Sequence, residues 1–152
     1  MDEIVARSIA RWPNVPAVFG WLSLDRRGRW RIRGETIANP ALREFIARNY
    51  EPDAQGRWYF QNGPQRVYVS LAYTPLVAHF EGDVLKDHCG RAFRPGALYV
   101  DDGGSVLVEG MGTIALLDDR DLARIADEAQ RFPTLAAAGV AEKYGFVPEP
   151  TP

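Results

Sequence analysis

The segment Asp53–Pro75, DAQGRWYFQNGPQRVYVSLAYTP, decides the fold class. Apolar and polar residues alternate on both sides of a break at Asn62-Gly63-Pro64. The alternating apolar residues are Trp58, Phe60, Val67, Val69 and Leu71. A period of two on each side of a Gly-Pro break is typical of two paired strands. Because this hairpin lies in the middle of the chain, we expect strands from both halves to add to it.

The turn of the first strand pair has a sequence signature that occurs three times. Asp-x-x-Gly, followed by apolar residues at alternate positions, begins at Asp25, Asp53 and Asp101. An Asp side chain can accept hydrogen bonds from the backbone ahead of it, and glycine supplies a positive φ. The first and third copies are followed by a glycine, a Thr-Ile pair and a helical segment. This order predicts a duplicated hairpin–helix unit.

Helices are expected in four places. An N-terminal helix is predicted over residues 2–12, and a second begins at Asn39-Pro40, with Asn39 as the cap. A third is expected to be capped by Asp118 or Asp119, and an Ala-rich helix spans 134–144, with Gly145 as its C-cap. Tight turns between consecutive strands predict antiparallel sheets and an α+β fold.

The expected domain organisation has three parts. Residues 1–90 hold the N-terminal helix, the first hairpin–helix unit and the central hairpins, and residues 91–147 hold the second unit and the C-terminal helix. Residues 148–152 are expected to form a mobile tail.

Two groups of motifs carry a family resemblance. Asp25-x-x-Gly28-x-Trp30, the helix that carries Leu42 and Phe45, and the Asp53–Val69 segment occur in an order similar to a bacterial family called domain of unknown function 1285. Shorter phrases, such as Trp12–Pro16, resemble a sister family of proteobacterial proteins. The resemblance implies repeated hairpin–helix motifs and a signalling role, and it assigns no catalytic residue.

Composition excludes several classes of protein. The 152 residues have a formal net charge of −2, so we expect no nucleic-acid partner and no attraction to an anionic membrane. No run approaches the roughly 20 apolar residues of a membrane span. Cys89 is the single cysteine, which excludes an internal disulfide and favours a cytoplasmic protein.

Four residues are candidates for soft-metal or nucleophilic chemistry: His79, Asp87, His88 and Cys89. Structural zinc usually needs paired cysteines or histidines at short spacing, which the sequence lacks, so no metal and no cofactor are predicted. A nucleophilic Cys89–His79 pair would require a stabilised thiolate. The alternative is a partly buried thiol beside a loop histidine.

The densest charged motif is Asp118-Asp119-Arg120-Asp121. Its carboxylates are suited either to a hard cation or to capping a helix N-terminus, and the second interpretation is favoured. Five arginines between Arg26 and Arg33 alternate with Trp30 and Ile32. They are suited to binding phosphate or a single strand, but a solvated sheet face that resists edge pairing is the favoured interpretation.

These observations favour a non-enzymatic module with a regulatory or signalling role that binds a small molecule or a protein. The candidate ligand-binding residues are Asn62, Gln65, Arg66, His79, His88, Asp119, Arg120 and Asp121. The alternative is a hydrolase or transferase that uses Cys89, His88 or the Asp118–Asp121 acids. A pocket that gathers His88 with those acids would favour the enzyme. A structural protein that forms a homodimer is a third alternative.

Overall fold

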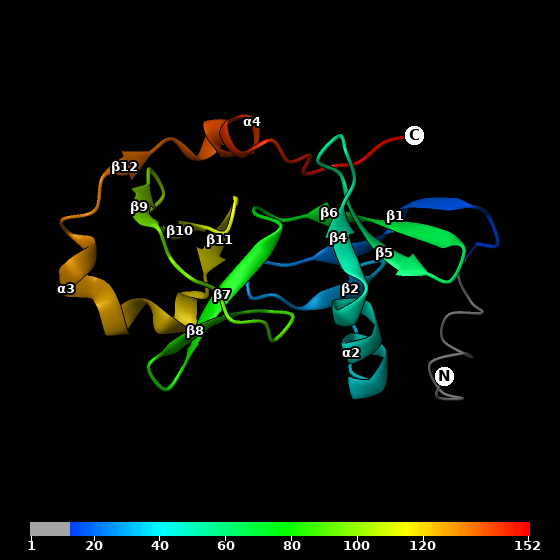
Figure 1. Cartoon of the computed structure of the whole chain (residues 1–152), viewed down its shortest axis with the longest axis horizontal. Helices are drawn as coiled ribbons and strands as arrows, with labels where there is room; N and C mark the ends of the chain where they lie inside the picture. The colour runs from blue at the N-terminus through cyan, green and yellow to red at the C-terminus, as the bar shows by residue number, and fades with distance from the viewer. Residues whose placement is uncertain (1–12) are drawn as a thin grey trace. The chain divides into compact units, whose positions relative to one another are not determined.

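The structure, a computed structural model, describes residues 13–152 and shows an α+β fold with two mixed sheets (Figure 1). The contacts divide the chain into two compact units. The first comprises residues up to Asp25, Arg29–Ala72 and Val147–Pro152, and the second comprises Arg26–Gly28 and Tyr73–Phe146. Residues 73–90 thus make their contacts in the second unit, whereas the sequence-based division groups them with the first. The predicted helix over residues 2–12 lies outside the described residues.

The first unit contains a six-stranded sheet with the order β3-β2-β1-β6-β5-β4. The strands are β1 (Ala17–Leu24), β2 (Trp30–Ile32), β3 (Glu35–Thr36), β4 (Tyr50–Pro52), β5 (Trp58–Asn62) and β6 (Gln65–Leu71). The predicted central hairpin is present as the antiparallel pair β5–β6, with Phe60 opposite Val67. Both of these side chains are fully buried, as the alternation requires.

Helix α2 (Pro40–Arg48) packs on the sheet of the first unit. The side chain of Asn39 accepts a hydrogen bond from the Leu42 backbone N–H at 3.0 Å, so the predicted cap is confirmed. The ring of Phe45 meets that of Phe60 edge to face, with centroids 5.5 Å apart. Leu42 and Ile46 are buried beside it, so one helical face supplies much of this core.

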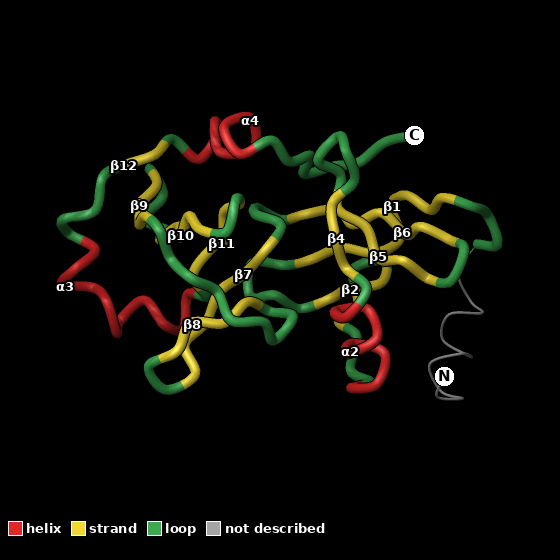
Figure 2. The backbone as a smooth tube through the Cα atoms, in the orientation of Figure 1, coloured by secondary structure: helices red, strands yellow, loops and turns green. Residues whose placement is uncertain are grey.

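The second unit contains a six-stranded sheet with the order β12-β9-β10-β11-β7-β8. Its strands are β7 (Leu76–Glu81), β8 (Val84–Asp87), β9 (Ala97–Asp101), β10 (Val106–Gly110), β11 (Thr113–Leu117) and β12 (Thr134–Leu135). Between β11 and β12 the chain forms the 3₁₀ helix η1 (Asp119–Ile125) and the helix α3 (Ala126–Ala129) (Figure 2). The 3₁₀ helix η2 (Ala137–Gly139) and the helix α4 (Val140–Tyr144) follow β12.

Four Asp-x-x-Gly turns have the same construction. Each aspartate accepts a hydrogen bond at Oδ1 from the backbone N–H four residues later, at 2.8 to 3.1 Å. The four turns begin at Asp25, Asp53, Asp87 and Asp101. Each ends in a glycine whose φ lies between +77° and +86°. The turn at Asp87 is a fourth copy, in addition to the three turns that the sequence predicted. The duplication of whole hairpin–helix units stays a prediction.

The prediction of purely antiparallel sheets was wrong. β1 pairs with β6, β7 with β11, and β9 with β12 in parallel. Turn residues predict antiparallel pairing only for strands that are joined by a short loop. Each of these three parallel pairs is joined by a long connection. The central hairpin also gains strands only from the first unit, because β7 to β12 form their own sheet.

Two predictions near the C-terminus need correction. The helix after Asp118 begins as the 3₁₀ helix η1, which has no buried residue to favour a longer α-helix. The helix predicted over 134–144 is reduced to α4, because Thr134 and Leu135 pair with β9 instead; Gly145 ends it with φ +71°. In the tail of residues 148–152, the carbonyl of Pro148 accepts a hydrogen bond from the Leu71 N–H at 2.7 Å, and the mobility of the tail stays a prediction.

Candidate functional site

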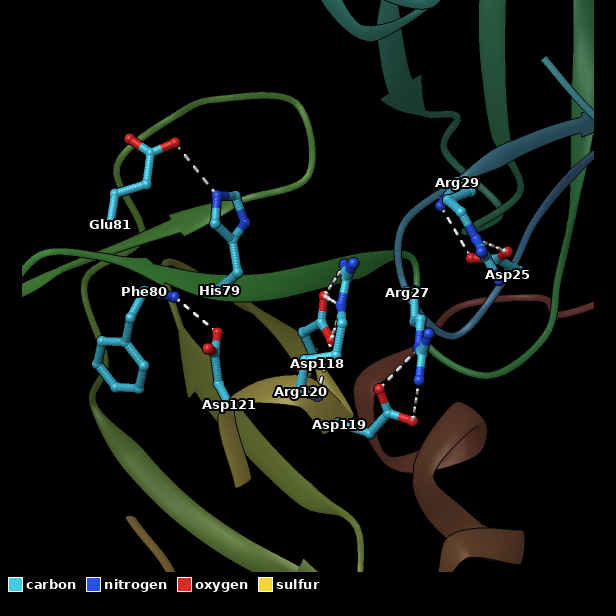
Figure 3. A network of polar contacts seen from close by, with 10 residues as sticks. All are labelled: Asp25, Arg27, Arg29, His79, Phe80, Glu81, Asp118, Asp119, Arg120 and Asp121. Carbon is cyan, nitrogen blue, oxygen red and sulfur yellow. Dashed lines mark hydrogen bonds and ion pairs between the residues drawn. The ribbon is translucent and has the colours of Figure 1, made fainter. Parts of the chain in front are cut away.

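A polar pocket of about 350 Å³ lies in the second unit. Four segments line it: the turn Arg27-Gly28, His79-Phe80 of β7, His88 of the turn after β8, and Asp118, Arg120 and Asp121 at the start of η1. Four of the eight candidate ligand-binding residues therefore line one pocket, namely His79, His88, Arg120 and Asp121. Figure 3 shows most of these side chains and the polar contacts between them.

Arg27 and Asp119 form a bidentate ion pair at one side of the pocket. Nε of Arg27 is 2.8 Å from Oδ1 of Asp119, and Nη2 is 3.3 Å from Oδ2 (Figure 3). Asp119 does not line the pocket itself, although the sequence predicted it as a ligand-binding residue. The Asp119 carboxylate instead orients the guanidinium of Arg27, which lines the pocket.

Asp118 and Arg120 form an ion pair in which the carboxylate is buried. The Asp118 side chain caps η1 by accepting from the Arg120 backbone N–H at 2.9 Å, as the favoured interpretation of the acidic motif predicted. Arg120 also donates from Nη2 to Oδ2 of Asp118 at 2.6 Å. Burial alone would raise the pKa of Asp118, but the hydrogen bonds from Arg120 outweigh it and hold that pKa below its ordinary value. Asp118 is therefore a charged structural anchor and a weak base.

The Arg120 side chain is 60% exposed, although it holds a buried carboxylate. It uses Nε and Nη2 for Asp118, and Nη1 makes no hydrogen bond to any of residues 13–152. Part of a fixed guanidinium is thus turned toward the solvent of the pocket. Such a group is pre-organised to bind a carboxylate or phosphate oxygen.

Asp121 and His79 are both positioned by contacts with residues of β7. Oδ2 of Asp121 accepts a hydrogen bond from the Phe80 backbone N–H at 2.9 Å. Nε2 of His79 lies 3.3 Å from Oε1 of Glu81. Figure 3 shows the imidazole of His79 and the ring of Phe80 on opposite sides of β7, as strand alternation requires. Asp121 therefore keeps Oδ1 for a ligand, while Oδ2 fixes its orientation.

His88 is fixed by contacts from two directions. Its Nδ1 accepts a hydrogen bond from the Val77 backbone N–H at 3.1 Å, so the neutral ring carries its proton on Nε2. A Cβ placed on Gly28 would lie only 2.5 Å from the Cβ of His88. The close approach of the turn to this histidine therefore requires glycine at position 28, where φ is +77°.

Cys89 does not supply a nucleophile to the pocket. Burial, with a contribution from the Asp87 carboxylate, raises the pKa of its thiol to about 12. The thiol stays protonated at neutral pH, and Cys89 is not among the residues that line the pocket. The interpretation of Cys89 as a partly buried thiol beside a loop histidine fits this geometry.

The other three candidate residues lie in the first unit and do not line the polar pocket. Nε2 of Gln65 donates to the carbonyls of Pro13 and Val15, at 2.6 and 2.7 Å. Asn62 donates to the side-chain oxygen of Gln65 at 3.1 Å, and the guanidinium of Arg66 lies over the ring of Tyr59. These contacts stabilise the β5–β6 turn, and a role in ligand binding stays a prediction for all three.

The arginines between Arg26 and Arg33 each have a partner inside the protein. Arg26 donates to Ser105, Arg27 pairs with Asp119, and Arg33 lies over the ring of Trp21. Arg29 and Arg31 both pair with Asp25. Each guanidinium of the stripe therefore contacts another side chain, and the absence of a nucleic-acid partner stays a prediction.

The sequence did not single out Arg27, Gly28 and Phe80 as members of the site. Arg27 stood out only as one of five arginines in a stripe, and its partner Asp119 is 92 positions away. Gly28 was recognised as a turn residue, a role that gives no sign of its contact with His88. Phe80 contributes through its backbone N–H, which every residue except proline possesses.

Two further properties concern metals and membranes. No cluster of three or more His, Cys, Asp or Glu side chains within residues 13–152 is arranged to hold a metal ion. In the same part of the chain, no helix combines the length and apolarity that a bilayer crossing demands.

Comparisons with solved structures place the fold among bacterial proteins. The chain is similar to a DUF1285 family protein from Silicibacter pomeroyi DSS-3, with a TM-score of 0.55, 19% identity and 84% of each chain covered. It is also similar to a DUF1285 family protein from Shewanella baltica OS155, with a TM-score of 0.52 and 14% identity, over 71% of this chain and 91% of that one. At these identities the likeness concerns the fold alone.

Sequence comparison identifies the family. No curated protein matches the chain. A family model described as "Protein of unknown function (DUF2946)" matches residues 1–149, which is nearly the whole sequence. The chain therefore belongs to the DUF2946 family of proteins of unknown function.

Proposed function

We propose that the protein is a non-enzymatic binding module with a regulatory role, and that its polar pocket takes a small ligand bearing an anionic group and a hydrogen-bond donor. The observation that carries this proposal is the pairing of Arg120 with Asp118. It fixes a guanidinium at the pocket while leaving the side chain 60% exposed. Amino acids and hydroxy acids have both of the required groups.

The positions of the charges support this ligand class. The exposed part of Arg120 suits a carboxylate or phosphate, and the second oxygen of Asp121 suits an ammonium or hydroxyl group. The charges of Asp118 and Asp119 are already compensated by Arg120 and Arg27. Asp121 is then the carboxylate of the site with no cationic partner among residues 13–152, and the ammonium group of an amino acid would offset its charge.

A non-enzymatic role is supported by the state of the reactive groups. The thiol of Cys89 is protonated, the lowered pKa of Asp118 makes it a poor general base, and Asp121 is held by a backbone N–H. The family resemblance adds the suggestion of signalling. The single cysteine supports a reducing compartment such as the cytoplasm.

A thermal-shift screen of amino acids, hydroxy acids, nucleotides and sugar phosphates tests the proposal. A ligand at 100 times its Kd should add about 2.7 kcal/mol to the free energy of unfolding. We expect Arg120→Lys and Asp121→Asn to weaken binding about tenfold, since each replaces a group that contacts the ligand. Arg124→Gln is the matched control, because Arg124 is also an exposed arginine paired with an aspartate but does not line the pocket. Equal losses in all three variants would refute the site.

A hydrolase or transferase is the second candidate, and one observation favours it. His88, Asp118 and Asp121 line the same pocket. A pocket that holds His88 together with these acids is the arrangement expected of an enzyme. Turnover of nitrophenyl esters or phosphates that is lost in His88→Gln and kept in Arg124→Gln would support the enzyme. The absence of turnover, together with ligand binding at Arg120, would support the binding module.

A further inference from the structure

A second cavity in the same unit differs in chemistry from the polar pocket. It has a volume of about 510 Å³, and eleven of its fourteen lining residues are apolar. They come from β7, β8, the loop after β8, β9, β10, β11, η1 and the segment around α3. Phe80 lines both cavities, with its backbone N–H bound to Asp121 of the polar pocket. The size and the apolar lining are typical of small-molecule sites.

Val84 marks the open side of this apolar cavity. It is 51% exposed, although it is a large aliphatic residue and part of the lining. Exposed aliphatic side chains that border a cavity supply apolar surface that a ligand can remove from water. The hydrophobic effect therefore favours an apolar body in this space.

The three charged residues of the lining indicate the head group of the ligand. Asp83 is compensated by Arg124, whose Nη2 lies 3.1 Å from Oδ1 of Asp83. Arg94 and Glu128 are exposed, and neither forms an ion pair with any residue of 13–152. Arg94 is thus the lining cation whose charge is left for a ligand.

The backbone that carries Arg94 is fixed from both sides. Phe93 donates to the Leu85 carbonyl at 2.9 Å, and Gly96 donates to the Glu109 carbonyl at 2.7 Å. A Cβ on Gly110 would lie 2.1 Å from the Arg94 carbonyl oxygen, so the loop packs directly on the backbone of β10. The Arg94 guanidinium can form two parallel hydrogen bonds with a carboxylate from this fixed position of the backbone. Glu128, in the short helix α3, is an acceptor-only carboxylate and cannot donate a hydrogen bond to the carboxylate of a ligand.

We infer that the apolar cavity binds a linear monocarboxylate, with the hydrocarbon chain against Val84 and the apolar wall and the carboxylate on Arg94. This site is separate from the proposed polar site and does not depend on it. Because burial of each CH₂ contributes about 0.8 kcal/mol, each added CH₂ should tighten binding about fourfold until the cavity is filled.

Calorimetric titration of the whole chain with hexanoate, octanoate and decanoate, below their micelle concentrations, tests this inference. We expect one molecule bound per chain and affinity that rises with chain length. Val84→Asp should weaken decanoate binding at least tenfold, because it places a charge against the hydrocarbon. Val15→Asp is the matched control, since Val15 is 45% exposed and lies outside the cavity.

The head group is tested with Arg94→Gln and with two other amphiphiles. The variant should weaken decanoate binding about fivefold, in keeping with an exposed ion pair, and leave decanol binding unchanged. Decylamine should bind more weakly than decanoate. The inference would be overturned by three results: no binding of any chain length, equal losses in Val84→Asp and Val15→Asp, or decylamine binding as tightly as decanoate. Circular dichroism of each variant confirms that the loss does not come from unfolding.

Discussion

Nη2 of Arg120 lies 2.6 Å from Oδ2 of Asp118, and the two side chains differ sharply in exposure, at 60% and 5%. A buried carboxylate without a partner is costly, so Arg120 compensates a charge that the fold has already removed from water. The same pair caps the first turn of η1. One ion pair thus serves both the local structure and the polar pocket.

The first prediction concerns the pH dependence of stability. Asp118 has a lowered pKa in the folded state, so its stabilising contribution is complete above its unfolded pKa of about 3.9 and is lost as the pH falls through the folded value. Asp118→Asn should lower the free energy of unfolding by about 1–2 kcal/mol near neutral pH. The difference between the two proteins should shrink below about pH 4. Urea unfolding from pH 7 to pH 2.5 measures the free energy of unfolding of both proteins. A difference between them that does not depend on pH would contradict the lowered pKa of Asp118.

The second prediction separates the contact of Gly28 with His88 from backbone strain. Gly28→Ala and Gly104→Ala both place a side chain at positive φ in an Asp-x-x-Gly turn, at +77° and +83°. A Cβ at position 104 meets no atom within 4 Å, whereas at position 28 it would collide with His88. Gly28→Ala should therefore cost about 1–3 kcal/mol more in the free energy of unfolding. Equal losses in thermal or urea unfolding would show that the packing against His88 carries no energy.

The third prediction concerns the turn at Asp87. Oδ1 of Asp87 accepts from the backbone N–H groups of Cys89 and Arg91, at 2.9 and 3.1 Å, and the side chain is buried. Asp87→Ala would leave two donors unsatisfied and should destabilise the protein by about 2–4 kcal/mol. Asp87→Asn retains the acceptor oxygen and should cost less than half as much. If both variants lose the same stability, charge and not hydrogen bonding holds this turn.

The fourth prediction concerns the reactivity of the single thiol. Since the pKa of Cys89 is raised to about 12, the folded protein should react with a disulfide reagent at pH 8 at least tenfold more slowly than the urea-unfolded chain. The absorbance of the released thiolate reports both rates. Fast reaction of the folded protein, together with loss of ligand binding after alkylation, would indicate that Cys89 is a functional residue.

The sequence predicted those features whose determinants are local. The Asn39 cap, the Asp118 cap and the β5–β6 hairpin depend on residues a few positions apart, and all are present. The parallel pairing of β1 with β6 depends on registers set across long connections, which turn chemistry does not encode. The helix after β11 is largely 3₁₀, because apolar periodicity does not reveal that a segment will lack a buried face. The helix after β12 was predicted too long, because Thr134 and Leu135 pair with a strand that is distant in sequence.

The sequence predicted several residues of the candidate site, but it did not predict which side chains contact one another. His79, His88, Arg120 and Asp121 stood out as chemically capable residues, and the fold brings them to one pocket. The role of Arg27 could not be predicted from the sequence, because its partner Asp119 lies 92 positions later in the chain. Pairing over such a distance is decided by sheet topology, which a single sequence specifies only weakly.

The division of the chain into units has a consequence for its synthesis. Residues 147–152 belong to the first unit but are made after all of the second, and Arg26–Gly28 belong to the second but are made before most of the first. Neither unit is therefore a continuous stretch that can finish folding as it leaves the ribosome. Expression of residues 1–72 or 73–146 alone would yield fragments that each lack a segment of their own unit. The last contacts of the first unit can form only after residues 147–152 have been made.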